Sequence, residues 1–270
     1  MDLKKEFGHI RFVIFGGSND RMKIVANSLA KSFWPVPLGQ ELVPIGSTTR
    51  YVLYRVGCVI CVSHQMGMAS VSILLNEITK LLAYAEAKDV VYLRLGTSGG
   101  IGLEPGTVVI TQEAVNGYLE PYYELVSMGR LIKMKSAMSD DVIAKLMDAA
   151  KQLQLKYPVV TGKTMSVDTF YEGQARLDGA ICEYTEQDKS NFITKLHQHN
   201  VANIEMEALL FGAFCNKLNI KVGVICVALL DRIKGDQVTF TAEDYLAWVD
   251  NTLNICKAFI AKELGIPFSA

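Results

Sequence analysis

The chain has 270 residues, half of them hydrophobic, so it can bury a large core without disulfide or metal support. Its 27 basic and 28 acidic residues give a net charge of −1, which argues against a nucleic-acid partner and against an acidic tail. The longest apolar run, 222–230, is shorter than the about 20 residues of a membrane helix, and residues 1–6 lack the apolar stretch of a secretory signal. We therefore expect a cytoplasmic protein with no membrane partner.

Segments of strand character alternate with segments of helical periodicity along the whole chain. In chain order, the pattern predicts a strand at 10–15, a helix at 20–33, a proline-marked loop, two strands within 51–62 that are separated at Gly57, a helix at 69–85, strands at 90–95 and 107–115, a helix at 140–153, a strand at 159–167, a helix at 189–199, a short strand closing on Glu205, a helix to Leu218, a strand at 221–230 and a helix at 242–264. This order predicts an α/β fold, a single-domain three-layer αβα sandwich over residues 1–270 with a mixed, mostly parallel central sheet.

The end of the first strand carries residues that suit an anion. Gly16 and Gly17 let backbone N–H groups approach a ligand, and Arg21 lies one turn into the following helix, whose N-terminus favours negative charge. The spacing is neither that of a P-loop nor that of a dinucleotide fingerprint. A tight turn with a solvated arginine explains the same residues, and from this segment alone it is the better interpretation.

Residues 93–100 are harder to explain as scaffold. Arg94 interrupts a strand that should be buried, and a buried guanidinium needs an anion or a carboxylate as its partner. The Gly-Thr-Ser-Gly-Gly sequence of residues 96–100 predicts a nest of N–H and hydroxyl groups of the kind that holds phosphate. Here an anion site is favoured over a structural role.

Four ordered motifs, GGSNDRM (16–22), RLGTSGGIGLEPG (94–106), FYEGQARLDG (170–179) and IEME (204–207), occur in the chain. With these motifs the chain resembles the nucleoside phosphorylases of the uridine phosphorylase type, over residues 7–264. The resemblance implies the fold of that family and the reversible phosphorolysis of uridine to uracil and ribose 1-phosphate. It implies no organic cofactor, because inorganic phosphate is the cosubstrate.

The resemblance assigns the phosphate to Gly17, Arg21, Arg94 and Thr97, whose cationic and N–H groups suit the attacking anion. It also places at Arg50 an arginine that reaches the active site of the neighbouring subunit, which implies a homo-oligomer, at least a dimer. Without the resemblance, Arg50 is an ordinary surface arginine after a loop.

The base is assigned to Phe170, Gln174 and Arg176. A glutamine amide both donates and accepts, which suits the N3–H and O2 of uracil, while the arginine stabilises the negative charge of the departing base. Phe170 packs on the ring in this assignment. A polar loop with solvated side chains is the weaker interpretation, because aromatic, amide and cation match the family pattern together.

The ribose is assigned to Met206 and Glu207, with Glu205 as a supporting group. A carboxylate here favours the positive charge that develops on the sugar. The segment follows a short strand and begins a helix, however, so the helix dipole alone also explains its carboxylates.

Asp231 departs from the uridine-specific pattern, which has asparagine there. The related purine nucleoside phosphorylases place at this point an aspartate that protonates the leaving purine, so purine phosphorolysis is an alternative. Gln174 and Arg176 outweigh it, since they have no counterpart in the purine enzymes.

Two histidines bear on the remaining alternative. Members of the family carry, before the first strand, a histidine for the 5′-hydroxyl of the neighbouring subunit's nucleoside, and His9 does not match that position. A catalytically weakened nucleoside-binding paralogue is therefore a further hypothesis. His64 follows a strand near the expected site, where a satisfied structural histidine is favoured over a ligand contact.

The six cysteines lie in apolar runs and are sparse, which predicts reduced, buried thiols. Cys58 and Cys61 have metal-like spacing but neither a second pair nor a flanking histidine, and His197 and His199 are wrongly spaced for one helix face. We predict no metal site.

Overall fold

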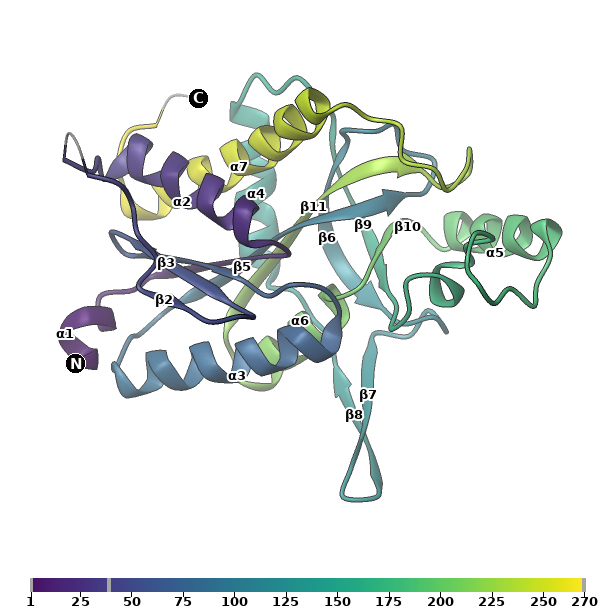
Figure 1. Cartoon of the computed structure of the whole chain (residues 1–270), viewed down its shortest axis with the longest axis horizontal. Helices are drawn as coiled ribbons and strands as arrows, with labels where there is room; N and C mark the ends of the chain where they lie inside the picture. Colours follow the sequence, from purple (N-terminus) through teal and green to yellow (C-terminus); the bar gives the residue numbers. More distant parts are fainter. Residues whose placement is uncertain (1, 38–39, 269–270) are drawn as a thin grey trace.

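The central element of the computed structural model, which describes residues 2–37 and 40–268, is a sheet of nine strands in the order β10-β9-β6-β11-β5-β1-β4-β3-β2 (Figure 1). The strands are β1 (Phe12–Gly16), β2 (Gly46–Ser47), β3 (Val52–Val56), β4 (Val59–Ser63), β5 (Val91–Gly100), β6 (Val108–Val115), β9 (Val159–Ser166), β10 (Val201–Glu205) and β11 (Lys221–Asp231). Five of the pairings are parallel and four antiparallel, so the predicted mixed, mostly parallel sheet is confirmed.

Helices cover both faces of this sheet, which confirms the three-layer αβα architecture (Figure 1). One core joins the sheet to α2 (Asn19–Phe33), α4 (Asp140–Gln152) and α7 (Ala242–Leu264), and the other joins it to α1 (Leu3–Phe7), α3 (Met68–Tyr84) and α6 (Ala208–Lys217). The remaining helix, α5 (Glu186–Gln198), packs beside β10. Both α5 and α7 begin with a capping box, Thr185 with Asp188 and Thr241 with Asp244.

β5 is longer than predicted, and this changes the interpretation of residues 96–100. They continue the strand instead of forming an N–H-rich nest, so that prediction was wrong. Gly96 to Ser98 pair with β11, while Gly99 and Gly100 pair with Ile204 and Asn203 of β10. Because β10 pairs with both β9 and β5, the sheet curls around at this end.

Several elements were not predicted. Three are short or isolated in the chain: helix α1, strand β2 and a single turn of 3-10 helix at Glu172–Gln174. The largest is a separate hairpin of β7 (Tyr122–Ser127) and β8 (Arg130–Lys135), which projects from the body of the protein (Figure 1). The helix predicted at 189–199 begins earlier, at Glu186. Residues 38–39 of the predicted proline-marked loop lie outside the described residues.

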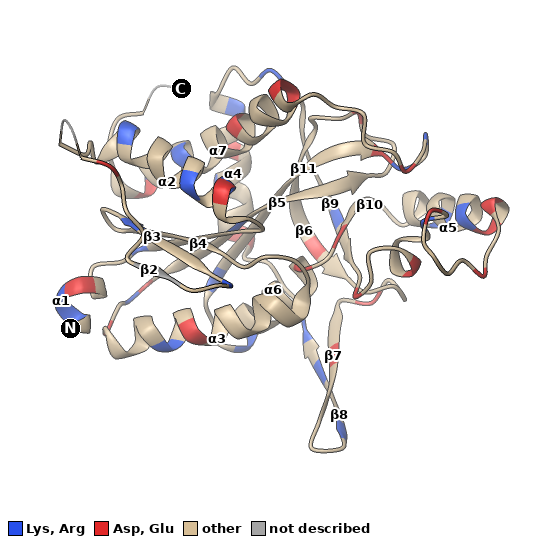
Figure 2. Ribbon diagram, viewed as in Figure 1, with Lys and Arg blue, Asp and Glu red and all other residues tan. Residues whose placement is uncertain are grey.

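Lys and Arg residues are interspersed with Asp and Glu along the outer helices, in keeping with the near-neutral net charge (Figure 2). Among residues 2–37 and 40–268, no helix combines the length and the apolar character that crossing a membrane requires.

Candidate active site

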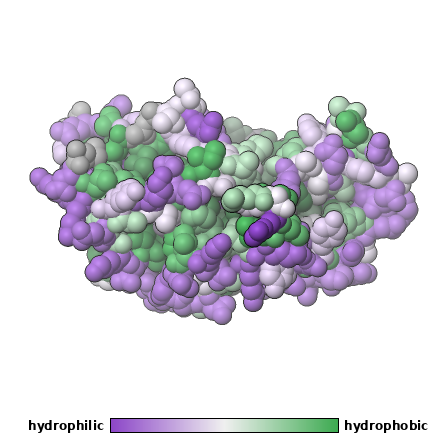
Figure 3. All heavy atoms as spheres, turned by 90° about the horizontal axis from the view of Figure 1, so that it is seen from below, coloured by the Kyte–Doolittle hydropathy of each residue, from purple (hydrophilic) through white to green (hydrophobic). Residues whose placement is uncertain are grey.

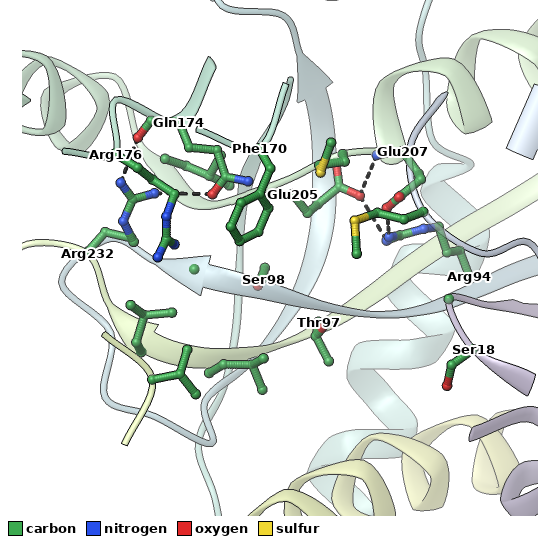
Figure 4. A pocket seen from close by; sticks show the side chains of 18 of the residues that line it. Ser18, Arg94, Thr97, Ser98, Phe170, Gln174, Arg176, Glu205, Glu207 and Arg232 are labelled. Carbon is green, nitrogen blue, oxygen red and sulfur yellow. Dashed lines mark hydrogen bonds and ion pairs between the residues drawn. The ribbon is translucent and has the colours of Figure 1, made fainter. Parts of the chain in front are cut away.

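A cavity of about 310 Å³ lies where β1, β5 and β11 end near the start of α6 (Figure 4). Its size and its mixed apolar and polar lining suit a small-molecule ligand. Every residue predicted to bind phosphate, ribose or base lines it, except Arg50: Gly17, Arg21, Arg94, Thr97, Phe170, Gln174, Arg176, Met206 and Glu207.

Arg94 is the charged centre of the cavity wall and is only 2% exposed. Its guanidinium forms ion pairs with Glu205, at 3.0 Å, and with Glu207 (Figure 4). Burial alone would lower the pKa of Arg94, but the two carboxylates outweigh it and raise that pKa, so the guanidinium stays charged. The sequence predicted an anion or a carboxylate as the partner of this buried arginine, and two carboxylates are its partners in the structure.

Glu205 and Glu207 are held by different parts of the backbone. Glu205 ends β10 and accepts hydrogen bonds from the N–H groups of Glu207, at 2.9 Å, and Ala208, at 3.0 Å, and from the Ser166 hydroxyl. Glu207 precedes α6 and accepts from the N–H of Gly67 at 2.5 Å. Burial raises the pKa of Glu205, and the charge of Arg94 offsets only part of that effect. Both glutamates line the cavity, but the oxygens of Glu205 are already bound by the backbone N–H groups of Glu207 and Ala208 and by Ser166, which suits a supporting role.

The glycines of β5 make room for two buried arginines. A Cβ atom at Gly96 would lie 2.4 Å from Nη1 of Arg94, and one at Gly99 would lie 2.8 Å from Cγ of Arg232. The motif predicted to be a phosphate nest is instead part of a strand, and the side chains of Arg94 and Arg232 pass close over its glycines. Thr97 and Ser98, between the glycines, still line the cavity.

Arg21 lies at the N-terminus of α2, where the Ser18 hydroxyl caps the helix by accepting from the Arg21 N–H at 3.3 Å. Its guanidinium donates twice to the hydroxyl of Tyr245 on α7, from Nε at 3.0 Å and from Nη2 at 2.7 Å. This hydroxyl orients the arginine, and no carboxylate among residues 2–37 and 40–268 forms an ion pair with it. Sequence reasoning missed Tyr245 because it lies 224 positions away in the chain.

The other end of the cavity holds the predicted base residues. Gln174 belongs to a single turn of 3-10 helix, and Arg176 follows a left-handed residue, Ala175. The guanidinium of Arg176 lies over the Phe170 ring, 4.7 Å from its centroid, and donates through Nε and Nη2 to Asp178 at 3.1 Å each. An aromatic face, an amide and a cation therefore meet here.

Arg232 is a site residue that the sequence did not reveal. It follows β11, is 1% exposed, and donates to both carbonyl groups of Gln174, from Nη2 to the main-chain oxygen at 2.6 Å and from Nη1 to Oε1 at 3.3 Å (Figure 4). A cation directly after a buried strand does indicate a buried arginine with a specific partner, but the sequence pattern at this point was interpreted through Asp231.

Asp231 does not line the cavity. Its Oδ1 accepts from the N–H of Gly102 at 2.9 Å and from that of Ile233 at 3.0 Å. The carboxylate therefore links the loop after β5 to the turn after β11. This arrangement counts against a proton-donating role toward a purine.

His64 is fully buried, and neither ring nitrogen has a hydrogen-bond partner among the described residues. The interpretation of a satisfied structural histidine was therefore wrong. Burial and then the charges of Arg94 and Arg21 lower its pKa well below the ordinary range, so the imidazole is neutral near pH 7. It does not line the cavity.

Arg50 is exposed just before β3, its guanidinium 5.8 Å from the Tyr51 ring centroid, and it is outside the cavity of its own chain.

The remaining predictions concern thiols and metals. Four cysteines are buried as expected, but Cys182 is exposed and Cys58 half-buried, so the prediction of uniform burial was wrong. Within residues 2–37 and 40–268, no three His, Cys, Asp or Glu side chains are grouped to hold a metal ion.

Comparison with known proteins identifies the family. Residues 11–261 match the model of the phosphorylase superfamily. Uridine phosphorylase 1 of Mus musculus is 39% identical over 98% of this chain and 85% of its own, and the uridine and thymidine phosphorylase of Caenorhabditis elegans is 39% identical over 98% and 88%. Among solved structures, one from a study of two uridine phosphorylases of the oomycete Phytophthora capsici is 45% identical, with a TM-score of 0.93 over 98% of this chain and 90% of that one.

The chain therefore belongs to the phosphorylase superfamily and, within it, to the uridine phosphorylases of the eukaryotic type. A relative named inactive uridine phosphorylase B, from Schistosoma mansoni, is also 36% identical over 90% of this chain and 82% of its own.

Proposed function

We infer that this protein is a uridine phosphorylase, which converts uridine and phosphate to uracil and ribose 1-phosphate, reversibly. The observation that carries the inference is the order of groups along one cavity. Ser18, which caps the helix that carries Arg21, lies toward one end, Gln174 and Arg176 lie at the other, and Glu207 lies between them (Figure 4). This is the order that an anion, a sugar and a base need for displacement at the bond between sugar and base.

We propose that Gly17, Arg21, Arg94 and Thr97 bind the phosphate. A phosphate oxygen attacks C1′ of the ribose, and the bond from C1′ to N1 of uracil breaks with its electron pair going to the base. Arg21 supports this role because its only hydrogen-bond partner for the guanidinium among the described residues is the neutral hydroxyl of Tyr245. Arg94 retains one buried N–H, at Nε, without a partner in the same part of the chain.

Glu207 and Met206 hold the ribose in this proposal. The carboxylate of Glu207 lies in the cavity wall and accepts from the sugar hydroxyls, and its charge stabilises the positive ribose that forms as the bond breaks. Arg94 holds Glu207 in place from behind through their ion pair.

Phe170, Gln174 and Arg176 receive the uracil. The base leaves as an anion, and Arg176 stabilises it best when that charge has developed, which lowers the barrier and not only the binding energy. Phosphate is a cosubstrate, so the residues supply positioning and electrostatics and no organic cofactor is proposed.

A second copy of the chain completes the phosphate end in our proposal. Arg94 is already matched by two carboxylates, so Arg21 is the one lining cation at that end whose charge is uncompensated among the described residues. Phosphate carries between one and two negative charges near pH 7, and in this assignment a carboxylate lies beside it. The exposed Arg50 of a neighbouring subunit would supply the second cation, which makes the enzyme at least a dimer.

The surface supports self-association. The hairpin β7–β8 exposes Val126 (73%), Met128 (98%) and Leu131 (59%), and Ile73 on α3 is also exposed (45%). Figure 3, viewed from the side on which the hairpin projects, shows apolar side chains among hydrophilic ones on this face. Apolar residues on an extended hairpin are typical of a subunit contact.

We further propose that residues 1–270 form one catalytic domain and that the enzyme works in the cytoplasm, where the exposed Cys182 stays reduced.

Turnover with and without phosphate tests the function. We expect uracil to form from uridine only when phosphate is present. A faster reaction with inosine would favour purine phosphorolysis instead. Saturable uridine binding without turnover would indicate a weakened paralogue, a possibility that the inactive relative keeps open.

Mixing two inactive variants tests the role of Arg50. If Arg50 acts in the neighbouring site, then Arg50→Ala and Glu207→Gln chains, each inactive alone, form mixed dimers that have one intact site. Random exchange at equal amounts should restore about a quarter of wild-type activity. No recovery, after exchange has been verified by native mass spectrometry, would place Arg50 outside the site.

A further inference from the structure

A chain of ionic contacts continues from the base end of the cavity into the protein. Arg232, which donates to both carbonyls of Gln174, also donates through Nε to Oδ1 of Asp236 at 2.8 Å. The other oxygen of Asp236 accepts from Nζ of Lys189 on α5 at 2.7 Å. Neither Asp236 nor Lys189 lines the cavity, so neither touches a bound base.

This chain is buried, which makes its geometry strict. The side chains of Arg232, Asp236 and Lys189 are 0%, 8% and 13% exposed. A buried charge that loses its partner is strongly destabilised, so each group holds its neighbour in one place. The stem of Arg232 is confined further, because it passes over Gly99 where a Cβ atom would not fit.

The consequence concerns the side-chain amide of Gln174. Its oxygen faces the Arg232 guanidinium, and a flipped amide would turn its NH₂ group toward that cation, donor against donor. The amide is therefore fixed with its oxygen as acceptor and its NH₂ as donor. An oxygen with a second lone pair next to an NH₂ group matches the N3–H and O2 of uracil. Cytosine presents an unprotonated N3 there, which would meet the same oxygen.

We propose that Asp236 and Lys189 are positioning residues that determine base specificity: by holding Arg232, they fix the Gln174 amide in the orientation that accepts uracil and rejects cytosine. The proposal rests on the proposed base site and adds to it two residues outside the cavity. The side chain of Asp236 acts on the base site through Arg232, because the other cation of that site, Arg176, contacts Asp236 at its main-chain oxygen, at 2.9 Å, which a change of the side chain leaves in place.

The test compares inhibition by free uracil and free cytosine. In Asp236→Asn, which keeps the size of the side chain but removes its charge, we expect the inhibition constant for uracil to rise about tenfold while that for cytosine changes little, which corresponds to the loss of one charge-assisted hydrogen bond. Lys189→Met should act in the same direction and more weakly. KM for uridine should rise with that constant, whereas KM for phosphate should stay the same.

A matched control breaks an exposed ion pair made by the loop that carries Asp236. Glu104→Gln breaks the exposed ion pair with Lys234, which is two residues from Asp236, and should leave both inhibition constants unchanged. If the wild-type protein does not prefer uracil to cytosine, the proposed base site itself is wrong. If the wild type prefers uracil and Asp236→Asn keeps the same ratio of the two constants while remaining folded, this inference alone is overturned.

Discussion

The fit between Gly99 and Arg232 yields a quantitative prediction. In Gly99→Ala the new methyl carbon would lie 2.8 Å from Cγ and 2.9 Å from Cδ of Arg232, whereas carbon atoms pack at about 3.5–4.0 Å. Arg232 must therefore move by roughly 1 Å. Such a shift stretches its bonds to Asp236, at 2.8 Å, and to the main-chain oxygen of Gln174, at 2.6 Å.

Overpacking of this kind costs about 1–3 kcal/mol in the free energy of unfolding. For a chain of this size we expect a fall in Tm of about 2–6 °C. The inhibition constant for uracil should rise as well, since Gln174 loses its support. Thermal unfolding followed by circular dichroism measures the first effect, and competition with uridine measures the second.

The control for backbone effects is Gly117→Ala, because Gly117 is exposed and a Cβ atom there would have no neighbour within 4 Å. A double-mutant cycle isolates the contact itself. With Arg232→Ala already present, Gly99→Ala should cost less than in the wild type by about 1 kcal/mol or more. Additive effects, or a Gly99→Ala protein that behaves like Gly117→Ala, would refute the reasoning.

Three more predictions follow from the site. Glu207→Gln should lower kcat/KM for uridine by about 10²–10³, because it removes the charge that favours the ribose cation, while calorimetry shows unchanged binding of free uracil. Tyr245→Phe removes the acceptor of two Arg21 hydrogen bonds and should raise KM for phosphate several-fold without changing inhibition by uracil; an unchanged KM would mean that Arg21 needs no such support. The third concerns His64, whose pKa is lowered by burial and by Arg94 and Arg21. Below pH about 6.5 the unfolded chain binds a proton that the folded protein does not, so stability falls with pH by at most about 1.4 kcal/mol per unit, down to the lowered pKa. Urea unfolding between pH 5 and 7 should show a shallower slope for His64→Gln than for the wild type, and parallel slopes would contradict this.

The layers of the fold were predictable because local patterns determine them. Helical periodicity at 242–264 and the apolar run at 221–230 correspond to α7 and β11 within one residue at each end. The hairpin β7–β8 carried a signal that was overlooked, since Met128 and Gly129, both at positive φ, join two strands. None of the side chains on its two strands is buried, so the strands lack the continuous apolar runs of the buried sheet.

A site residue was predictable where the neighbouring residues in the sequence already show that its side chain needs a partner or a ligand. Arg94 stands out because a cation in a buried strand demands a partner. That the partners are Glu205 and Glu207 depends on the pairing of β10 with β5, which no local pattern reveals. The role of the glycines was misread for a related reason: the space at Gly99 is filled by Arg232, which is distant in the chain, and the space at Gly96 by Arg94, whose guanidinium is held by carboxylates of another segment.

Asp231 shows why one matching residue does not transfer a function. Asp231 is the last residue of β11 and Arg232 the first residue of the turn that follows, and the two side chains have different partners. Here Arg232 faces Gln174, and the Asp231 carboxylate turns the other way, to the N–H groups of Gly102 and Ile233. A purine-protonating aspartate would have to leave both N–H groups and reach the cavity, which Asp231 does not line. The contacts of the carboxylate, and not the identity of residue 231 alone, therefore decide between the two assignments.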